Sequence, residues 1–370
     1  MNNKIKVDAL TGVNIDEICG RHKVYIKTAE QLEDKVDFKE IPYVDSKLKI
    51  NIPYKYIIHN LFFYPKIAQK YIRNNVDIIH FFSQEETYLI KSLKTNAPKI
   101  ATCLDIIGLT LKEYDFIDKS FKSFSIKCMK DADKIIAISN YTKNELIKYT
   151  KISPEKIKTI YLGADEQFKK LSKNEIENSC TENNFPENFI LYVGSEQSRK
   201  NLPILIKAFY KLKKNYNLKD IKLIKSGKPQ ISDFQRKKLF NLIADLDLQN
   251  DVIFTDYVTD NDLVKLYNAA NLFVYPSLYE GFGLPPLEAM ACGCPVITSN
   301  TSSLPEVVGD AGIMIDPNDI NSLTESMYEV LTNDGLKENL SKKSLERSKM
   351  FTWKKTANET EKIYEEVLNY

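Results

Sequence analysis

Residues 275–300, YPSLYEGFGLPPLEAMACGCPVITSN, are the most informative part of the sequence. An apolar strand is expected to end at Ser277, and the loop 280–283 then leads into a helix that begins near Pro285. The two glycines of this loop, Gly281 and Gly283, let the backbone approach a ligand closely. The free N–H groups at the start of the helix carry about half a positive charge, so they favour a phosphate there.

Two carboxylates flank this expected anion site. Glu280 precedes the glycine loop, and Glu288 lies one turn inside the helix. Carboxylates repel phosphate but accept hydrogen bonds from hydroxyl groups, so the combination suits a sugar or a ribose linked to phosphate. The alternative is that both are ordinary surface acids. The strand–loop–helix context favours the binding site.

A second stretch, LYVGSEQSRKNLPILIKAF (191–209), has the same organisation. Its strand ends at Gly194, and Arg199 and Lys200 stand at the start of the next helix. Two cations at the carboxyl end of a strand suit a diphosphate, and Lys200 is expected to be exposed in the cleft. A solvated basic turn is the alternative, and the acidic loop at 280–283 makes it less attractive.

Strand-like and helix-like segments alternate outward from these two stretches along the whole chain, which predicts parallel βαβ units. The 370 residues exceed what one hydrophobic core supports. We therefore predict an α/β protein of two doubly wound Rossmann-like domains that face each other across a cleft, with ligands at the carboxyl ends of the strands. The expected domains are 1–171 and 189–350, with a polar linker at 172–188 and a C-terminal helix at 351–370 that returns to the first domain.

Composition narrows the function classes. The 43% apolar and 28% charged residues indicate a folded protein, and no stretch approaches the roughly 20 apolar residues that span a bilayer. Six scattered Cys and three His make a zinc site improbable and favour reduced thiols in the cytoplasm. The N-terminal sequence lacks the pattern of a signal peptide.

Charge is unevenly distributed. Residues 1–170 hold 29 Lys and Arg against 22 Asp and Glu, an excess of +7, and the remaining residues have 23 against 28, or −5. An aromatic, basic run, NIPYKYIIHNLFFYPKIAQKYIR (51–73), lies in the basic half. It predicts a face that docks peripherally on an anionic membrane and receives a lipid-linked acceptor. Packing of the aromatic side chains into the first domain's core is the alternative.

The order of motifs resembles the retaining nucleotide-sugar glycosyltransferases of family GT4, which have the GT-B fold. The resemblance covers about 133–316 and rests on KIIAISNYTKNEL, KIKTIYLGADEQF, YVGSEQSRKNLPILIKAF, DYVTDNDLVKLYNAANLFVYPS, YEGFGLPPLEAM and SSLPEVVGDAGIMIDP. The wording of GFGLPPLEAM and SSLPEVVGD is similar to mannosyltransferases of surface-polysaccharide assembly.

The resemblance implies roles for individual residues. Glu280 would contact the donor sugar, Glu288 would hold the ribose hydroxyls, and Lys200 with Arg199 would neutralise the diphosphate. Tyr257 and Val258 would lie near the base, and Gly12 under the donor phosphates. The implied catalytic residues are Glu280, Lys200, Arg199 and Asp105. The implied donor-binding set is Gly12, Gly194, Ser195, Arg199, Lys200, Tyr257, Val258, Glu280, Gly281, Phe282, Gly283, Leu284 and Glu288.

The resemblance further implies transfer of a hexose to a glycan or lipid-linked acceptor hydroxyl, with no metal, no cofactor and no nucleic-acid partner. GDP-mannose is the first choice of donor, and a UDP-sugar is the alternative. Ser195 stands where many members have Arg, and Leu104 stands where the family often has His before Asp105. A non-catalytic sugar-nucleotide-binding subunit is therefore kept as an alternative, and His80 is weighed as a substitute for the family His or, more simply, as a packed residue.

Other enzyme classes fit less well. A nicotinamide dehydrogenase should show G-x-G-x-x-G after an early strand, and the only G-x-G here is residues 281–283. A metal-dependent GT-A transferase should show D-x-D; residues 131–133 and 245–247 have this spacing but fall in helical stretches. A GT-B sugar-nucleotide epimerase is the remaining possibility.

Overall fold

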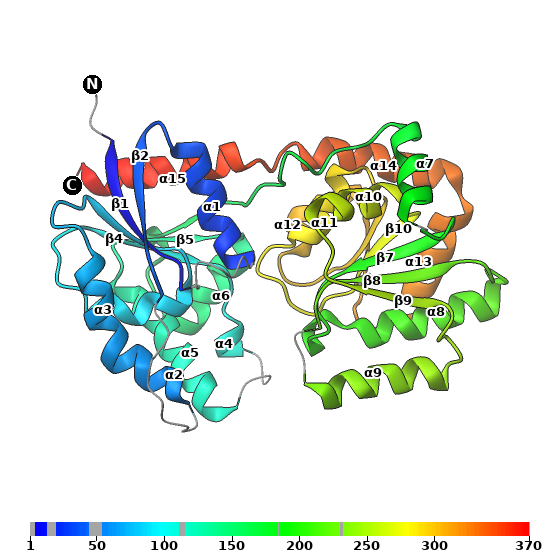
Figure 1. Cartoon of the computed structure of the whole chain (residues 1–370), viewed down its shortest axis with the longest axis horizontal. Helices are drawn as coiled ribbons and strands as arrows, with labels where there is room; N and C mark the ends of the chain where they lie inside the picture. Colours follow the sequence, from blue (N-terminus) through cyan, green and yellow to red (C-terminus); the bar gives the residue numbers. More distant parts are fainter. Residues whose placement is uncertain are drawn as a thin grey trace. The chain divides into compact units, whose positions relative to one another are not determined.

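The computed structural model describes residues 4–12, 20–43, 54–110, 115–183, 185–229 and 232–369. The chain divides into two compact units, Met1–Gly163 with Trp353–Tyr370, and Ala164–Thr352. Each unit is built on a parallel six-stranded sheet flanked by helices (Figure 1). The predicted α/β class with two Rossmann-like domains is confirmed.

The first unit has the strand order β2-β1-β3-β4-β5-β6. Its strands are β1 (Ile5–Leu10), β2 (Val36–Ile41), β3 (Ile78–Phe81), β4 (Lys99–Cys103), β5 (Lys134–Ala137) and β6 (Ile157–Thr159). Its helices are α1 (Gly20–Leu32), α2 (Lys55–Ile58), the π-helix η1 (His59–Phe63), α3 (Tyr64–Tyr71), the 3₁₀-helix η2 (Gln84–Leu89), α4 (Ile107–Thr110), α5 (Phe116–Cys128), the 3₁₀-helix η3 (Met129–Asp131), α6 (Asn140–Thr150), the 3₁₀-helix η4 (Pro154–Lys156) and α15 (Trp353–Leu368).

Side chains on the two faces of this sheet enter two separate hydrophobic clusters, as alternation along a strand requires. Val7 and Ile78 on one face pack with Leu32 of α1 and Tyr364 of α15. The opposite face packs under α3, α5 and α6. The central strands β3, β4 and β5 are consequently buried on both sides, which is typical of parallel sheets covered by helices.

Helix α15 is joined to the sheet of the first unit by buried polar contacts as well as by apolar packing. His80 on β3 is fully buried between the Tyr364 hydroxyl, 2.7 Å from Nδ1, and the Thr102 hydroxyl, 2.8 Å from Nε2. Burial lowers the pKa of His80 to about 3, so the ring stays neutral. The structure thus favours the packed reading of His80 over a role at the donor sugar.

The second unit has the strand order β12-β11-β10-β7-β8-β9. Its strands are β7 (Phe189–Val193), β8 (Lys222–Ser226), β9 (Val252–Asp256), β10 (Leu272–Tyr275), β11 (Val296–Ser299) and β12 (Ile313–Ile315). Its helices are α7 (Lys173–Asn183), the 3₁₀-helix η5 (Ser198–Lys200), α8 (Leu202–Tyr216), α9 (Asp233–Asp245), α10 (Asp260–Ala269), α11 (Leu284–Ala291), α12 (Leu304–Val308), the 3₁₀-helix η6 (Gly309–Ala311), α13 (Ile320–Thr332) and α14 (Asp334–Ser348).

The segment 172–188 differs from the prediction of a linker. Residues Lys173–Asn183 form α7, which belongs to the second unit and contacts α10. Ser172 and Glu175 hydrogen-bond each other's backbone N–H, at 3.4 Å and 2.7 Å, so they cap the first turn reciprocally. The polar composition reflects a solvated helix, and the chain passes between the units at Gly163–Ala164 and Thr352–Trp353 instead.

The exposed surface of the first unit carries much of the aromatic run. Tyr64 is buried in the core, whereas Phe62 is 65% exposed and Phe63 is also exposed. In the part of the chain that the structure describes, no helix combines the length and apolar character that crossing a bilayer demands.

Candidate active site

The candidate active site of the second unit forms where β7 and β10, which are neighbours in the sheet, both end. The loop after β7 contains Arg199 and Lys200, and the loop after β10 contains Glu280 and Gly283. Because carboxyl ends of neighbouring parallel strands share one edge, these two loops meet. A backbone hydrogen bond of 2.7 Å from Leu278 N–H to the Arg199 carbonyl joins them directly.

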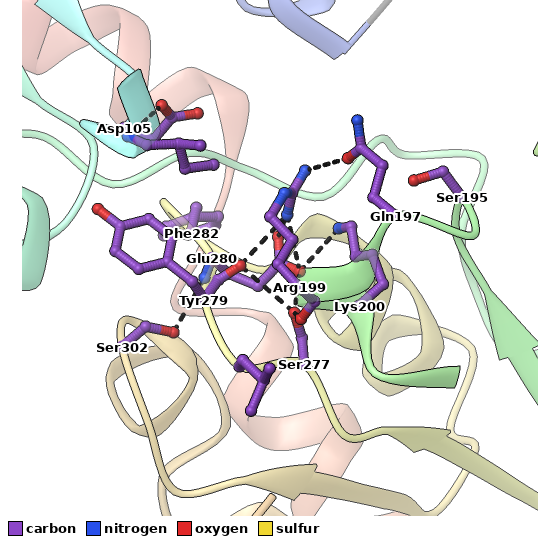
Figure 2. A network of polar contacts seen from close by, with 12 residues as sticks. Asp105, Ser195, Gln197, Arg199, Lys200, Ser277, Tyr279, Glu280, Phe282 and Ser302 are labelled. Carbon is purple, nitrogen blue, oxygen red and sulfur yellow. Dashed lines mark hydrogen bonds and ion pairs between the residues drawn. The ribbon is translucent and has the colours of Figure 1, made fainter. Parts of the chain in front are cut away.

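An ion cluster lies at this junction (Figure 2). The Lys200 Nζ is 2.7 Å from Glu280 Oε1, and the Arg199 guanidinium is 3.4 Å from Oε2. The Ser277 hydroxyl donates to Glu280 Oε1 at 2.6 Å. Lys200 also donates to the Tyr275 hydroxyl and lies over its ring. The structure therefore brings together the three predicted residues Arg199, Lys200 and Glu280.

Burial sets the electrostatics of this cluster. Glu280 is 8% exposed and Lys200 is 9% exposed, so our expectation of a solvent-exposed Lys200 was wrong. Burial alone would raise the pKa of Glu280, but the charges of Lys200 and Arg199 and hydrogen bonds from Lys200 and Ser277 outweigh it. The net effect holds the pKa of Glu280 below its ordinary value, and the carboxylate is ionised at neutral pH.

The predicted glycine loop takes a conformation that requires glycine. Gly283 has φ +122°, and a Cβ there would lie 2.9 Å from a Leu304 side-chain carbon. Ser303 supports the loop, since its hydroxyl lies 2.9 Å from the Glu280 carbonyl and 2.7 Å from the Phe282 carbonyl. The loop thereby delivers Leu284 and the N-terminus of α11 to the same edge of the sheet.

The second predicted carboxylate is a buried residue of α11. Glu288 is 7% exposed and accepts a 3.2 Å hydrogen bond from the Tyr267 hydroxyl of α10. Burial, followed by the Glu288 charge, raises the pKa of Tyr267 well above its ordinary value, so Tyr267 remains a neutral donor. The Tyr267 hydroxyl therefore fixes the orientation of one carboxylate oxygen of Glu288.

The remaining donor-binding predictions lie after β7 and β9. Gly194 packs against the Tyr192 ring, whose hydroxyl donates to the Ser195 carbonyl at 2.9 Å. Tyr257 is 66% exposed, and the Lys228 Nζ lies 5.2 Å from its ring centroid. An exposed aromatic face of this kind is suitable for stacking a base. Val258 is half-buried beside it.

Two predicted residues belong to the first unit. Gly12 has φ +67° and lies so close to Glu86 that a Cβ on Gly12 would be 1.6 Å from Glu86 Oε1. Asp105 follows β4, and its carboxylate accepts from the Ile107 N–H at 3.1 Å and from Gln84 at 3.3 Å. Glycine at position 12 is therefore required by a carboxylate, which the sequence did not indicate.

Four side chains of the site were missed by sequence reasoning: Tyr275, Ser277, Tyr267 and Ser303. Each contacts a predicted residue or its loop through a hydroxyl group. Tyr275 and Ser277 stand within five residues of Glu280, in YPSLYEG, which was the available signal. Tyr267 gave none, because its partner is 21 positions away.

Comparison with known proteins identifies the class of protein to which the chain belongs. Residues 173–347 match the family model "Glycosyl transferases group 1", and residues 21–168 match "Glycosyltransferase Family 4". The sucrose-phosphate synthase structure from Thermosynechococcus elongatus superposes with a TM-score of 0.82 at 21% identity, covering 99% of this chain and 100% of that one. A sheet and site of this kind, in two Rossmann-like units, define the GT-B fold class.

Two curated relatives share more sequence with this chain than that structure does. The serotype-specific mannosyltransferase WbdA of Escherichia coli is 34% identical over 76% of this chain and 36% of its own length. The O-antigen chain mannosyltransferase B of Escherichia coli is 32% identical over 72% of this chain and 69% of its own length. The chain thus spans about a third of the length of WbdA. It belongs to the family 4, group 1 glycosyltransferases.

Proposed function

We propose that this glycosyltransferase is a retaining, metal-independent hexosyltransferase. It moves a hexose from a nucleoside diphosphate sugar to a hydroxyl group of a glycan or lipid-linked acceptor. The observation that carries the proposal is the buried cluster of Arg199, Lys200 and Glu280 beside the N-terminus of α11.

The cluster supplies what the leaving group requires. As the bond from sugar to phosphate breaks, negative charge develops on the diphosphate. Lys200 and Arg199 are fixed positive groups beside the N-terminus of α11, and preorganised charges of this kind stabilise a transition state without having to reorient. Such a site neutralises the diphosphate without a divalent cation.

Each carboxylate has a distinct part. Glu280, ionised and anchored by Lys200, accepts hydrogen bonds from hydroxyls of the transferred sugar. Glu288, oriented by Tyr267, accepts from the ribose hydroxyls, and Tyr257 stacks on the base. Retention follows from a front-face route in which a leaving phosphate oxygen takes the proton of the acceptor hydroxyl. Asp105 stays a prediction as a catalytic residue.

Mannose is the preferred sugar, with GDP as its carrier, because the curated relatives named above are mannosyltransferases. A UDP-linked glucose or N-acetylglucosamine is the alternative donor. Leu104 in place of the family His favours one other function, a non-catalytic subunit that binds the sugar nucleotide. We further propose that the chain acts in the cytoplasm, with the first unit at an anionic membrane surface.

Thermal unfolding with a panel of GDP-, UDP-, ADP- and TDP-sugars tests donor choice. A bound donor at 100 times its dissociation constant stabilises the protein by about 2.7 kcal/mol. Slow release of nucleoside diphosphate in the absence of acceptor then separates the two functions, because a binding subunit shifts the unfolding temperature without releasing product. Stabilisation by no sugar nucleotide would contradict both.

A further inference from the structure

The loop 299–303, SNTSS, begins with the last residue of β11, and β11 is the neighbour of β10 in the sheet. Its hydroxyl groups contact the backbone of the loop that follows β10. The Ser299 hydroxyl donates to the Ser277 carbonyl, and the Thr301 hydroxyl lies 3.3 Å from the same carbonyl. Loop 299–303 therefore supports the segment that leads to Glu280.

Two adjacent serines of this loop hold both backbone polar groups of Glu280. The Glu280 N–H donates to the Ser302 hydroxyl oxygen at 3.1 Å (Figure 2). The Ser303 hydroxyl lies 2.9 Å from the Glu280 carbonyl. Because Glu280 is only 8% exposed, loss of the partner of its N–H would cost free energy. The main chain of Glu280 is thus fixed independently of the ion pairs that its side chain makes.

Ser302 has a backbone conformation that a serine seldom adopts. Its φ is +55°, in the left-handed region, where a Cβ is unfavourable and glycine fits without strain. Glycine at this position would relieve the strain but would remove the hydroxyl. Strained conformations at a site persist where the surrounding structure requires them. The hydrogen bond from the Glu280 N–H supplies such a requirement at Ser302.

The carboxylate of Glu280 requires accurate placement. Glu280 Oε1 lies 2.7 Å from the Lys200 Nζ and 2.6 Å from the Ser277 hydroxyl. A misplacement of about 1 Å can cost about a hundredfold in rate, even when its cause lies away from the reacting atoms. A shift in the Glu280 backbone would therefore affect the sugar that this carboxylate is proposed to bind.

We propose that Ser302 is a positioning residue for sugar transfer. Its hydroxyl group fixes the main chain of Glu280 and thereby sets the position of the carboxylate at the donor sugar. The inference rests on the proposed function of Glu280. Ser302 is assigned no contact with the substrate, and its effect passes through Glu280.

Paired substitutions separate the hydroxyl of Ser302 from its backbone strain. Ser302→Gly and Ser302→Ala both remove the hydroxyl, but only alanine retains the unfavourable φ. We expect turnover of the donor to fall at least about tenfold in both variants, because Glu280 is misplaced in both. The unfolding temperature of Ser302→Gly should exceed that of Ser302→Ala by about 2–4 °C. Wild-type turnover in either variant would overturn the proposal.

Asn217 provides a matched control for backbone strain. It has φ +53°, is exposed, and follows α8 at the end opposite to Lys200, about 22 Å along this helix of 15 residues. Asn217→Gly and Asn217→Ala should reproduce the difference in unfolding temperature and leave turnover unchanged. If the Asn217 variants lost as much turnover as the Ser302 variants, the rate would depend on general stability, and the positioning role would be wrong.

Two measurements without turnover examine the contact itself. The Glu280 amide should exchange its hydrogen about threefold to tenfold faster in Ser302→Gly than in wild type or Asn217→Gly, because its acceptor is gone. Free nucleoside diphosphate should bind Ser302→Gly as it binds wild type, since Glu288 is proposed to hold the ribose. Unchanged exchange of the Glu280 amide, or an equal loss of nucleotide affinity and turnover, would contradict a role that passes through Glu280.

The outcomes distinguish this inference from the proposed function. Wild-type turnover of the Ser302 variants together with loss of turnover in Glu280→Gln would refute only the positioning role. If the wild-type chain turned over no sugar nucleotide, the proposed function would fail, and the positioning role would fail with it.

Discussion

Lys200 and Glu280 form a buried ion pair in the candidate active site. Both side chains are nearly buried, and each compensates the other's charge at 2.7 Å. Removal of one member of such a pair leaves a buried charge uncompensated, which costs more than the pair itself contributes. Function and stability are therefore linked at this position.

Lys200→Ala tests that link. We expect turnover of the donor to fall by about 10²–10³, because one preorganised charge is lost, and the free energy of unfolding to fall by about 3 kcal/mol. Lys207→Ala, on an exposed position of α8, is the matched control and should behave as wild type. Steady-state kinetics and chemical denaturation measure the two effects. Wild-type turnover in folded Lys200→Ala would contradict the assignment.

Glu280 makes the stability of the protein depend on pH in the acid range. Its pKa is lowered in the folded state, so its contribution is complete above the unfolded pKa of about 4.3 and is lost as the pH falls through the folded pKa. The stability difference between wild type and Glu280→Gln should be constant near neutral pH and shrink below about pH 4. Glu325→Gln, at an exposed position, should show no such trend. A difference that grows on acidification would have the wrong sign.

Sequence reasoning reached Arg199, Lys200 and Glu280 because each stands next to a glycine loop or a strand end. It failed on the exposure of Lys200, since a lysine in a turn is ordinarily solvated. The reason lies in Tyr275 and Glu280, about 75 and 80 positions away, which surround it. Burial of this kind arises from tertiary packing and leaves no local signal.

A second buried ion pair connects the loop 194–201 to the sheet of the second unit. Glu196, in the loop, lies 3.0 Å from Lys225 on β8, and the side chains of both are inaccessible to solvent. Arg236 of α9 lies 3.7 Å from the other Glu196 oxygen and 3.0 Å from Asp256. Burial lowers the pKa of Lys225, and Glu196 counteracts this. These charged contacts connect β8 and α9 to the loop 194–201.

A double-mutant cycle measures this support. Glu196→Gln and Lys225→Met should each lower the free energy of unfolding by about 3–5 kcal/mol, because each strands a buried charge. The double variant should be less destabilised than the sum of the two, since it strands none. Chemical denaturation of the four proteins gives the coupling. Simple additivity would mean that the pair is energetically unimportant.

Helices and strands could be predicted from the sequence where the periodicity of apolar residues and the helix caps were clear. The strands and helices around residues 189–300 were predicted because apolar runs there are bounded by Gly, Pro or Asn. Helix α7 was missed because only Ile176 and Cys180 of its residues are apolar, although Ser172 and Glu175 have the spacing of a capping box. A polar helix is stabilised by its cap and by α10, and composition alone does not reveal either.

At the scale of the whole molecule, the basic first unit presents apolar side chains to solvent. Phe62, Phe63, Phe116 and Phe124 are exposed, and Phe116 is 84% exposed. Lys66 and Lys70 are exposed on α3 beside the first two. Aromatic side chains with lysine neighbours suit a lipid headgroup region.

Vesicle co-sedimentation tests this surface. We expect the chain to bind anionic vesicles at low salt and to be released by added salt, with each lysine near the surface contributing about 1 kcal/mol. Lys66→Glu with Lys70→Glu should abolish most of the binding. Lys130→Glu with Lys158→Glu makes the same change in net charge at other exposed sites of the unit and should have a smaller effect. Equal loss in both pairs would indicate that net charge alone, and no defined surface, is responsible.

Glu280 and Lys200 are proposed to bind and activate a sugar nucleotide. The most direct test uses the sugar nucleotide that stabilises the protein. ¹H and ³¹P NMR follow its conversion by wild type, by Glu280→Gln and by the exposed control Glu325→Gln. We expect release of nucleoside diphosphate with the sugar transferred in its original anomeric configuration, at a rate at least about 10² lower in Glu280→Gln and unchanged in Glu325→Gln. Turnover by Glu280→Gln at the wild-type rate, or an inverted product, would contradict it.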